Sequence, residues 1–140
     1  MSTTSTPSPG SATSAPCLGF DYTLLQAVPR VDRGERINVG ALLYCKEADF
    51  LAAEVHIDPA RLRALDTEVD LTGVTDALEA IRAICAGDES AGQAGAGTLR
   101  SRFGWLTAPR SAVVQTGAVH GGLTADPTAE LDRLMNRLVR

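Results

Sequence analysis

Three apolar segments joined by short polar turns constrain the fold of this chain more than any other feature. The segments span residues 22–28, 37–45 and 50–57. They are rich in apolar and β-compatible residues, and the first turn contains Gly34, which takes a positive φ at little cost. Consecutive strands with connections this short tend to pair side by side, so the segments predict an antiparallel meander.

Two Asp-Pro pairs predict the starts of two helices. In Asp58-Pro59 and in Asp126-Pro127, the aspartate suits the N-cap and the proline suits the first helical position. Leu62 and Leu65 anchor the first of these helices, which is short. The inner face of the second, C-terminal helix is predicted to consist of Leu131, Leu134, Met135 and Leu138.

The longest predicted helix spans residues 71–86 and ends at Gly87. Its apolar stripe recurs at i, i+4, i+7 and i+11 through Val74, Leu78, Ile81 and Cys85. After it we expect a flexible Gly/Ala-rich loop near 87–97, a fourth strand over 111–116 and an irregular loop over 117–124. These elements predict an α+β fold, with a small, mainly antiparallel sheet, helices packed over it and a C-terminal helix.

Length and composition suit a single domain. The chain has 140 residues and is 44% hydrophobic, which is enough for one core. Residues 18–140 are predicted to form the domain, and residues 1–17, rich in Ser, Thr and Pro, a disordered tail. This tail lacks the regions of a signal peptide, and no segment approaches the ~18 apolar residues of a membrane span. The three cysteines form no C-x-x-C pair, so we expect reduced thiols, a cytoplasmic protein and no membrane partner.

Charge is distributed unevenly along the chain. The formal net charge is −4 and the isoelectric point is about 5.1, which argues against general binding to nucleic acids or membranes. Between residues 47 and 89 there are eleven carboxylates and three arginines, whereas residues 98–110 contain three arginines and no carboxylate. The two segments either attract each other or form two faces for different partners.

The basic segment also contains the only tryptophan of the chain. Arg100, Arg102 and Arg110 accompany Phe103 and Trp105. One interpretation is a hydrophobic plug surrounded by solvated arginines. Another is an anion-binding surface, because guanidinium groups match the geometry of carboxylates and phosphates. A third is a stacking surface for single-stranded nucleic acid, which the overall acidity disfavours.

Two further groups of polar residues are candidates for a site. Arg33, Glu35 and Asn38 lie among glycines in and after the first turn. They suit either a polar ligand or a charged hairpin turn in which Asn38 makes local hydrogen bonds. His120 precedes two glycines, and a histidine in such a place can be a general base or a ligand because the glycines leave room for a substrate.

No known catalytic or cofactor fingerprint is found in the sequence. The two histidines lack metal-ligand spacing, the serines lie in no G-x-S-x-G elbow, and the glycines form no phosphate-binding loop. We therefore assign no catalytic residue, no cofactor and no metal from the sequence.

Several blocks of residues occur at spacings typical of one bacterial family. The blocks are Tyr22 with Val28-Pro29, Arg33-Gly34-Glu35, Asn38-Val39-Gly40, residues 103–111, Gln115-Thr116, His120 and residues 124–127. Through them, the chain from about residue 20 to residue 140 resembles the bacterial domain-of-unknown-function family 3037.

The resemblance implies a small cytosolic protein without an established activity. Some members are encoded beside kinases similar to the HipA toxins, which implies a role as partner or modulator of such a kinase. The family motif also includes polar residues, among them Arg33, Glu35, Asn38, Arg110 and His120. These residues form either a shared site or an internal network. With Arg102 added, the candidate ligand or partner site consists of Arg33, Glu35, Asn38, Arg102, Trp105, Arg110, Gln115 and His120.

Three classes of function remain open, one of them the single-stranded nucleic-acid binding considered above, and the oligomeric state is open as well. The first is a non-enzymatic interaction protein that binds a HipA-like kinase or another protein through its arginines and aromatic rings. The second is a hydrolase or nuclease-type enzyme, with Glu35 or His120 as general base and Arg33 and Arg110 stabilising an anion. Convergence of Glu35, Arg110 and His120 in one pocket would favour the enzyme.

Overall fold

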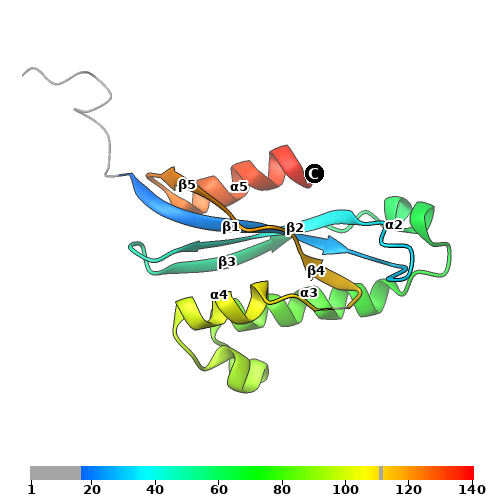
Figure 1. Cartoon of the computed structure of the whole chain (residues 1–140), viewed down its shortest axis with the longest axis horizontal. Coiled ribbons are helices and arrows are strands. Elements are labelled where there is room, and N and C mark those ends of the chain that lie inside the picture. Colours follow the sequence, from blue (N-terminus) through cyan, green and yellow to red (C-terminus); the bar gives the residue numbers. More distant parts are fainter. Residues whose placement is uncertain (1–16, 111) are drawn as a thin grey trace, which may run out of the picture.

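The computed structural model describes residues 17–110 and 112–140, so residues 1–16 of the predicted tail lie outside the described part. Within it, the chain forms five strands: β1 (Leu18–Ala27), β2 (Ile37–Cys45), β3 (Phe50–Val55), β4 (Val114–Thr116) and β5 (His120–Thr124). They make one sheet in the order β3-β2-β1-β4, and β5 also pairs with β1 (Figure 1). All pairs are antiparallel, which confirms the predicted meander and the α+β class.

One edge of the sheet is built from two short strands on β1. β4 pairs with Leu25–Ala27, and β5 pairs with Leu18–Tyr22. Between them the chain leaves the edge at Gly117, whose carbonyl accepts a 2.8 Å hydrogen bond from the hydroxyl of the buried Thr23. The hydroxyl thus satisfies the Gly117 carbonyl, which lies where the hydrogen-bond ladder along β1 is interrupted.

The prediction of an irregular loop over 117–124 is wrong for residues 120–124, which form β5. Glycine is depleted in strands, so the pair Gly121-Gly122 hid the strand in the sequence. Gly122 has a packing reason, because a Cβ there would lie 2.7 Å from the ring of Phe20 on the neighbouring strand. The ring thus occupies the space beside the glycine.

Helices cover both faces of the sheet. They are α2 (Pro59–Leu65), α3 (Leu71–Ala86), the 3-10 helix η1 (Glu89–Gly95), α4 (Leu99–Thr107) and α5 (Pro127–Leu138). Asp58 and Asp126 accept backbone hydrogen bonds at the starts of α2 and α5, as predicted, and Gly87 ends α3 with φ of 69°. The sequence missed η1, which lies in the segment predicted as a flexible loop, and α4, which contains most of the basic segment.

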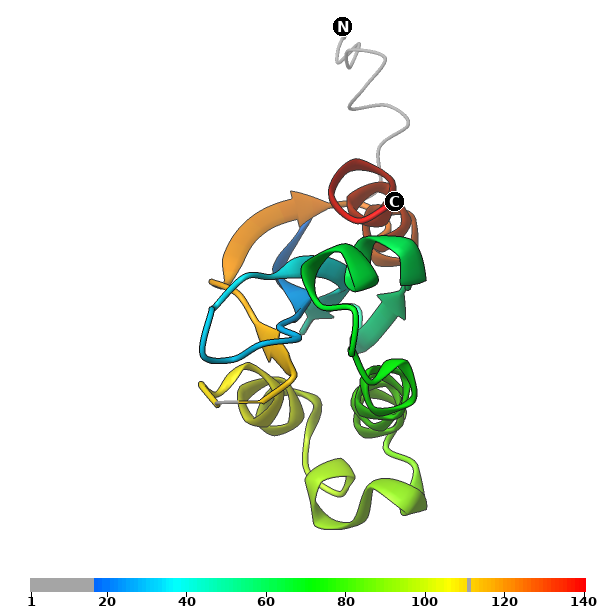
Figure 2. The ribbon, with the colours of Figure 1, turned by 90° about the vertical axis from the view of Figure 1, so that its right-hand side faces the viewer.

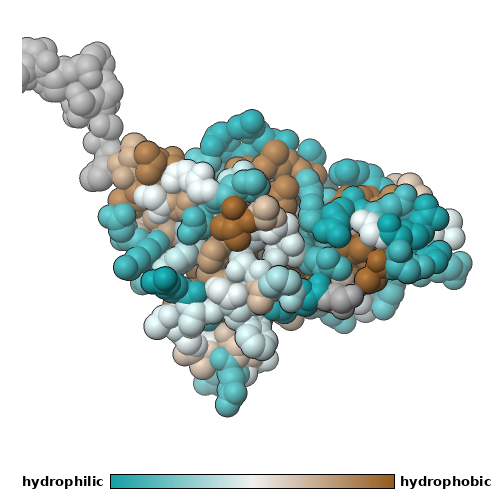
Figure 3. Space-filling view, viewed as in Figure 1, coloured by the Kyte–Doolittle hydropathy of each residue, from teal (hydrophilic) through white to brown (hydrophobic). Residues whose placement is uncertain are grey.

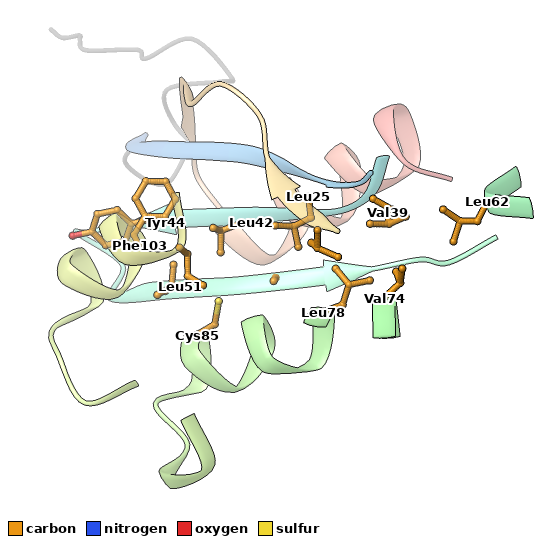
Figure 4. Packing of buried hydrophobic residues seen from close by; sticks show 14 residues of the cluster. Leu25, Val39, Leu42, Tyr44, Leu51, Leu62, Val74, Leu78, Cys85 and Phe103 are labelled. Atoms are coloured by element: carbon orange, nitrogen blue, oxygen red, sulfur yellow. The ribbon is translucent and has the colours of Figure 1, made fainter. Parts of the chain in front are cut away.

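The sheet separates two hydrophobic cores. Figure 2 shows α3 and α4 side by side below the sheet and α5 above it. The first core joins the sheet to α2, α3 and α4 through Leu25, Val39, Leu42, Tyr44, Leu51, Leu62, Val74, Leu78, Cys85, Phe103, Leu106 and Val114 (Figure 4). The second core joins it to α5 through Phe20, Ala41, Leu43, Cys45, Leu131, Leu134, Met135 and Val139.

A β-bulge in β2 places Asn38 on the face of the sheet that α5 covers. Leu25 pairs with Gly40 and Gln26 pairs with Asn38, so Val39 is an extra residue in β2. Gly40 is required here because a Cβ would lie 2.5 Å from the carbonyl oxygen of Glu54 on β3. Val39 enters the first core, whereas Asn38 contacts α5.

We expect the three cysteine thiols to differ sharply in reactivity. Cys17 is exposed, whereas Cys45 and Cys85 are buried. Burial raises the pKa of the Cys85 thiol from 9.0 to about 12, and the thiolate is the reactive form. A thiol reagent at neutral pH should therefore label Cys17 alone in the native protein and all three cysteines after denaturation. Rapid native labelling of Cys85 would contradict the buried position.

The burial of Cys85 also makes the stability of the protein depend on pH in the alkaline range. The unfolded thiol ionises near its ordinary pKa of 9.0, whereas the folded thiol stays protonated up to about pH 12. The contribution of Cys85 to stability is thus complete below pH 9.0 and is lost as the pH rises toward 12. A Cys85→Ala variant should lack this component of the pH dependence.

Candidate functional site

Helix α4 separates the two aromatic residues of the basic segment. The Thr98 hydroxyl caps the helix by accepting a hydrogen bond from the backbone N–H of Ser101. Phe103 is buried and stacks on Tyr44, with 5.3 Å between ring centroids. Trp105, two residues later on the helix, points away from the core and is 55% exposed. The segment is thus part core and part surface.

Arg102 is half-buried and holds α4 against α3. Its Nη1 donates to the carbonyl oxygens of Ile84 and Cys85 at 3.1 and 2.8 Å, and its Nε donates to the carbonyl of Gly97 at 3.0 Å. The last carbonyls of a helix lack partners within the helix and form the negative end of its dipole. The guanidinium satisfies them at the end of α3, so Arg102 has few donors left for a ligand.

Arg110 lies at the surface, beside the C-terminal end of α4. Its Nη2 donates to the carbonyl of Trp105 and its Nε to the carbonyl of Ala108. The guanidinium carbon lies 5.7 Å from the centroid of the Trp105 ring, which is cation–π distance. Among the described residues Arg110 forms no ion pair with a carboxylate. The stacked side chain keeps a fixed direction and retains guanidinium N–H groups for another acceptor.

A small pocket adjoins Arg110 between the end of α4 and β4. It has a volume of about 170 Å³ and is lined by Thr107, Pro109, Arg110, Gln115, Thr116 and Gly117. Gln115 is held by a 2.9 Å hydrogen bond from its Nε2 to the carbonyl of Ala112. The pocket has room for one small polar group. We call Trp105, Arg110 and Gln115 the Trp–Arg surface.

Asn38 belongs to a network that fastens α5 to the sheet. Its Nδ2 donates to the carbonyl of Leu138 at 3.0 Å, and its Oδ1 accepts from Gln26 at 3.1 Å. Gln26 in turn accepts from Arg36 at 3.1 Å. Asn38 therefore satisfies a backbone carbonyl at the end of α5. This hydrogen bond is long-range, whereas the sequence suggested a local one. Gln26 and Arg36 carry no sequence signal that would have marked them.

Arg33 and Glu35 form an ion pair with each other in the exposed turn between β1 and β2. Arg33 Nε donates to Glu35 Oε1 at 2.8 Å, and the side chains are 56% and 44% exposed. Arg30 and Asp32 form a similar pair in the same turn, and the hydrogen bond from Arg30 lowers the pKa of Asp32. Exposed pairs of this kind contribute little to stability. Glu35 is thus engaged by Arg33 and has no contact with Arg110.

His120 lies apart from the other candidates. It is exposed on β5, where it pairs with Tyr22, and the two ring centroids are 5.4 Å apart. Gln115, which lines the pocket beside Arg110, pairs with Gln26. Gln26 follows Tyr22 by four residues on β1, so the strand separates the two pairs by roughly 13 Å at ~3.3 Å per residue. Glu35 lies beyond that, in the turn after β1. Glu35, Arg110 and His120 therefore do not share a pocket. The described predicted site residues instead meet in two separate places, the Arg33–Glu35 pair and the Trp–Arg surface.

Two features of other site classes are absent from the described part of the chain. No cluster of three or more His, Cys, Asp or Glu residues there has the arrangement of a metal site. None of the helices described has the length and apolar character needed to cross a membrane.

The fold and the polar surface define a small α+β domain with helices on both faces of an antiparallel sheet. The chain belongs to the family described as Protein of unknown function (DUF3037), whose model matches residues 22–139. Comparison with curated proteins and with solved structures finds no match. This match confirms the resemblance inferred from the sequence.

Proposed function

We propose that this protein is a non-enzymatic interaction protein whose Trp–Arg surface binds an acidic segment of a partner protein. The observation that carries the proposal is the guanidinium of Arg110 stacked on the exposed ring of Trp105. No carboxylate occurs in residues 98–110 to occupy that guanidinium. The Trp105 ring contributes little to the core and, together with the guanidinium beside it, is accessible to a partner.

The chemistry of these side chains suits protein recognition. Tryptophan and arginine are enriched among the residues that dominate binding energy at interfaces. A guanidinium fork can hold a carboxylate through two parallel hydrogen bonds, and the adjacent pocket beside Gln115 has room for such a group. The side of the molecule seen in Figure 3 is a mosaic of hydrophilic residues with small, separate apolar patches, so a polar, carboxylate-bearing partner suits it better than a large apolar one.

The partner we propose is a HipA-like kinase in the bacterial cytoplasm. This choice rests on the family resemblance, since some members are encoded beside such kinases. The acidic segment would lie on the kinase, and the small protein would act as its modulator.

The two competing classes have less support. An enzyme would need Glu35 or His120 near Arg110, but Glu35 is paired with Arg33, and His120 lies on β5 opposite Tyr22, away from Arg110. Single-stranded nucleic acid could stack on Trp105, but the net charge of −4 opposes binding to a polyanion.

Variants of the Trp–Arg surface should lose binding without losing stability. Arg110→Lys should change the free energy of unfolding by less than about 0.5 kcal/mol, as surface substitutions usually do. It should weaken binding to the kinase from the same host, because lysine cannot form a bidentate fork. Trp105→Ala should weaken binding by about tenfold or more. Titration calorimetry with the purified kinase measures both effects.

Arg61→Lys is the matched control, because Arg61 is exposed on α2 and forms no ion pair among the described residues. It should bind like the unmodified protein. Equal affinity for all variants, or no binding to the kinase at native concentrations, would refute the proposal. Tight binding to a single-stranded oligonucleotide that falls steeply with salt would support the nucleic-acid class instead.

A further inference from the structure

A larger hollow lies on a different part of the molecule, between α3 and η1. It has a volume of about 460 Å³, within the ~300–1,000 Å³ range of ligand sites. Its lining consists of Asp76, Glu79, Ala80, Ala83, Ile84, Ser90 and Ala91. None of these residues belongs to the Trp–Arg surface. We call this hollow the acidic groove.

The acidic groove follows the outer face of α3. Its floor contains the small side chains Ala80 and Ala83 and the half-buried Ile84. Together with Asp76 these positions recur at helical spacing, so the groove runs along about two turns of α3, or ~12 Å. η1 forms the other wall, and it is packed closely, since a Cβ on Gly95 would lie 2.8 Å from that of Ala91.

The charge of this region is strongly negative. Residues 66–89 contain seven carboxylates (66, 68, 70, 76, 79, 88 and 89) and one arginine. That arginine, Arg82, contacts Glu79 at 3.4 Å in an exposed pair. Asp76 forms no ion pair among the described residues. An occupant must therefore combine positive charge with a narrow apolar surface.

We propose that the acidic groove binds a cationic amphipathic helix of a partner protein. Its leucine-like side chains would lie on Ala80, Ala83 and Ile84, and its lysines or arginines would face Asp76 and Glu79. Amphipathic helices bind in such grooves through apolar anchors at i, i+4 and i+7, which lie on one face of the helix. This site is separate from the Trp–Arg surface and has the opposite charge preference.

The test uses the full chain and a fluorescein-labelled helical peptide with leucines at i, i+4 and i+7 and lysines and arginines elsewhere. Fluorescence anisotropy should show binding that weakens with salt. The double variant Asp76→Asn/Glu79→Gln should weaken it by about three- to tenfold, since each exposed charge contributes modestly. Ala80→Trp should weaken it by about tenfold or more by filling the groove. Thermal melting checks that each variant folds.

Two control variants test whether the loss of peptide binding arises at the acidic groove. Glu47→Gln/Glu68→Gln removes two exposed carboxylates of the segment 47–89 that lie outside the groove, and it should leave binding unchanged. Trp105→Ala should also leave it unchanged, which separates this site from the proposed function. Amide shifts of the 14.7 kDa protein on peptide addition should concentrate on α3 and η1 and do not depend on any variant.

Four results would overturn the proposal. They are equal binding by the groove variants and the controls, equal binding of a peptide with glutamates in place of lysines and arginines, amide shifts spread over the whole surface, and self-association that the groove variants abolish. The last of these would assign the groove to a second copy of this chain.

Discussion

Replacement of Leu134 by alanine is expected to lower the free energy of unfolding by about 2–5 kcal/mol. Leu134 is 4% exposed and lies in the second core, where α5 covers Phe20, Ala41 and Leu43. Alanine would remove apolar contacts and leave a cavity that the two strands cannot close easily. Urea denaturation followed by circular dichroism measures the change.

Arg137→Ala is the control for this prediction, because Arg137 is exposed on the same helix. It should change the free energy of unfolding by less than about 0.5 kcal/mol. A loss below about 0.5 kcal/mol for Leu134→Ala as well would mean that α5 does not cover this face of the sheet in solution.

Replacement of Arg102 by alanine is expected to lower the free energy of unfolding by about 1.5–3 kcal/mol. The guanidinium donates to the carbonyls of Ile84, Cys85 and Gly97, and its removal leaves the end of α3 without these donors. The same change at Arg100, which is exposed on the same helix, should have little effect. Chemical denaturation of the two variants gives the comparison directly.

Similar stabilities for Arg102→Ala and Arg100→Ala would contradict the structural role of Arg102. A loss of partner binding in Arg102→Ala with unchanged stability would place it at the interface instead. The pair of variants thus distinguishes a structural arginine from a surface one within a single helix.

Local patterns predicted much of the fold. The stripe through Val74 and Leu78 located α3, and the Asp-Pro pairs located α2 and α5, because caps and periodicity depend on neighbours in sequence. A signal for α4 was also present. Thr98 suits an N-cap, and Leu99, Phe103 and Leu106 recur at i, i+4 and i+7, but Gly104 interrupts the pattern.

The candidate site was harder to predict, because long polar side chains take their direction from distant parts of the chain. Arg102 and Arg110 belong to the same basic segment, yet one is turned toward α3 and the other toward solvent. Asn38 bonds to a residue that is 100 positions away in sequence. Composition locates such residues, but only the packing of α3, α4 and α5 decides which of them a partner can reach.

The interrupted edge of the sheet has a consequence for solubility. Open strand edges are templates on which other chains can add, and short or irregular strands are a common protection. Here the outer side of β1 is covered by strands of three and five residues with a detour at Gly117 between them. Neither piece offers a long, flat row of free backbone groups. A straight strand from residue 114 to residue 124 would offer one, and with it a route to aggregation.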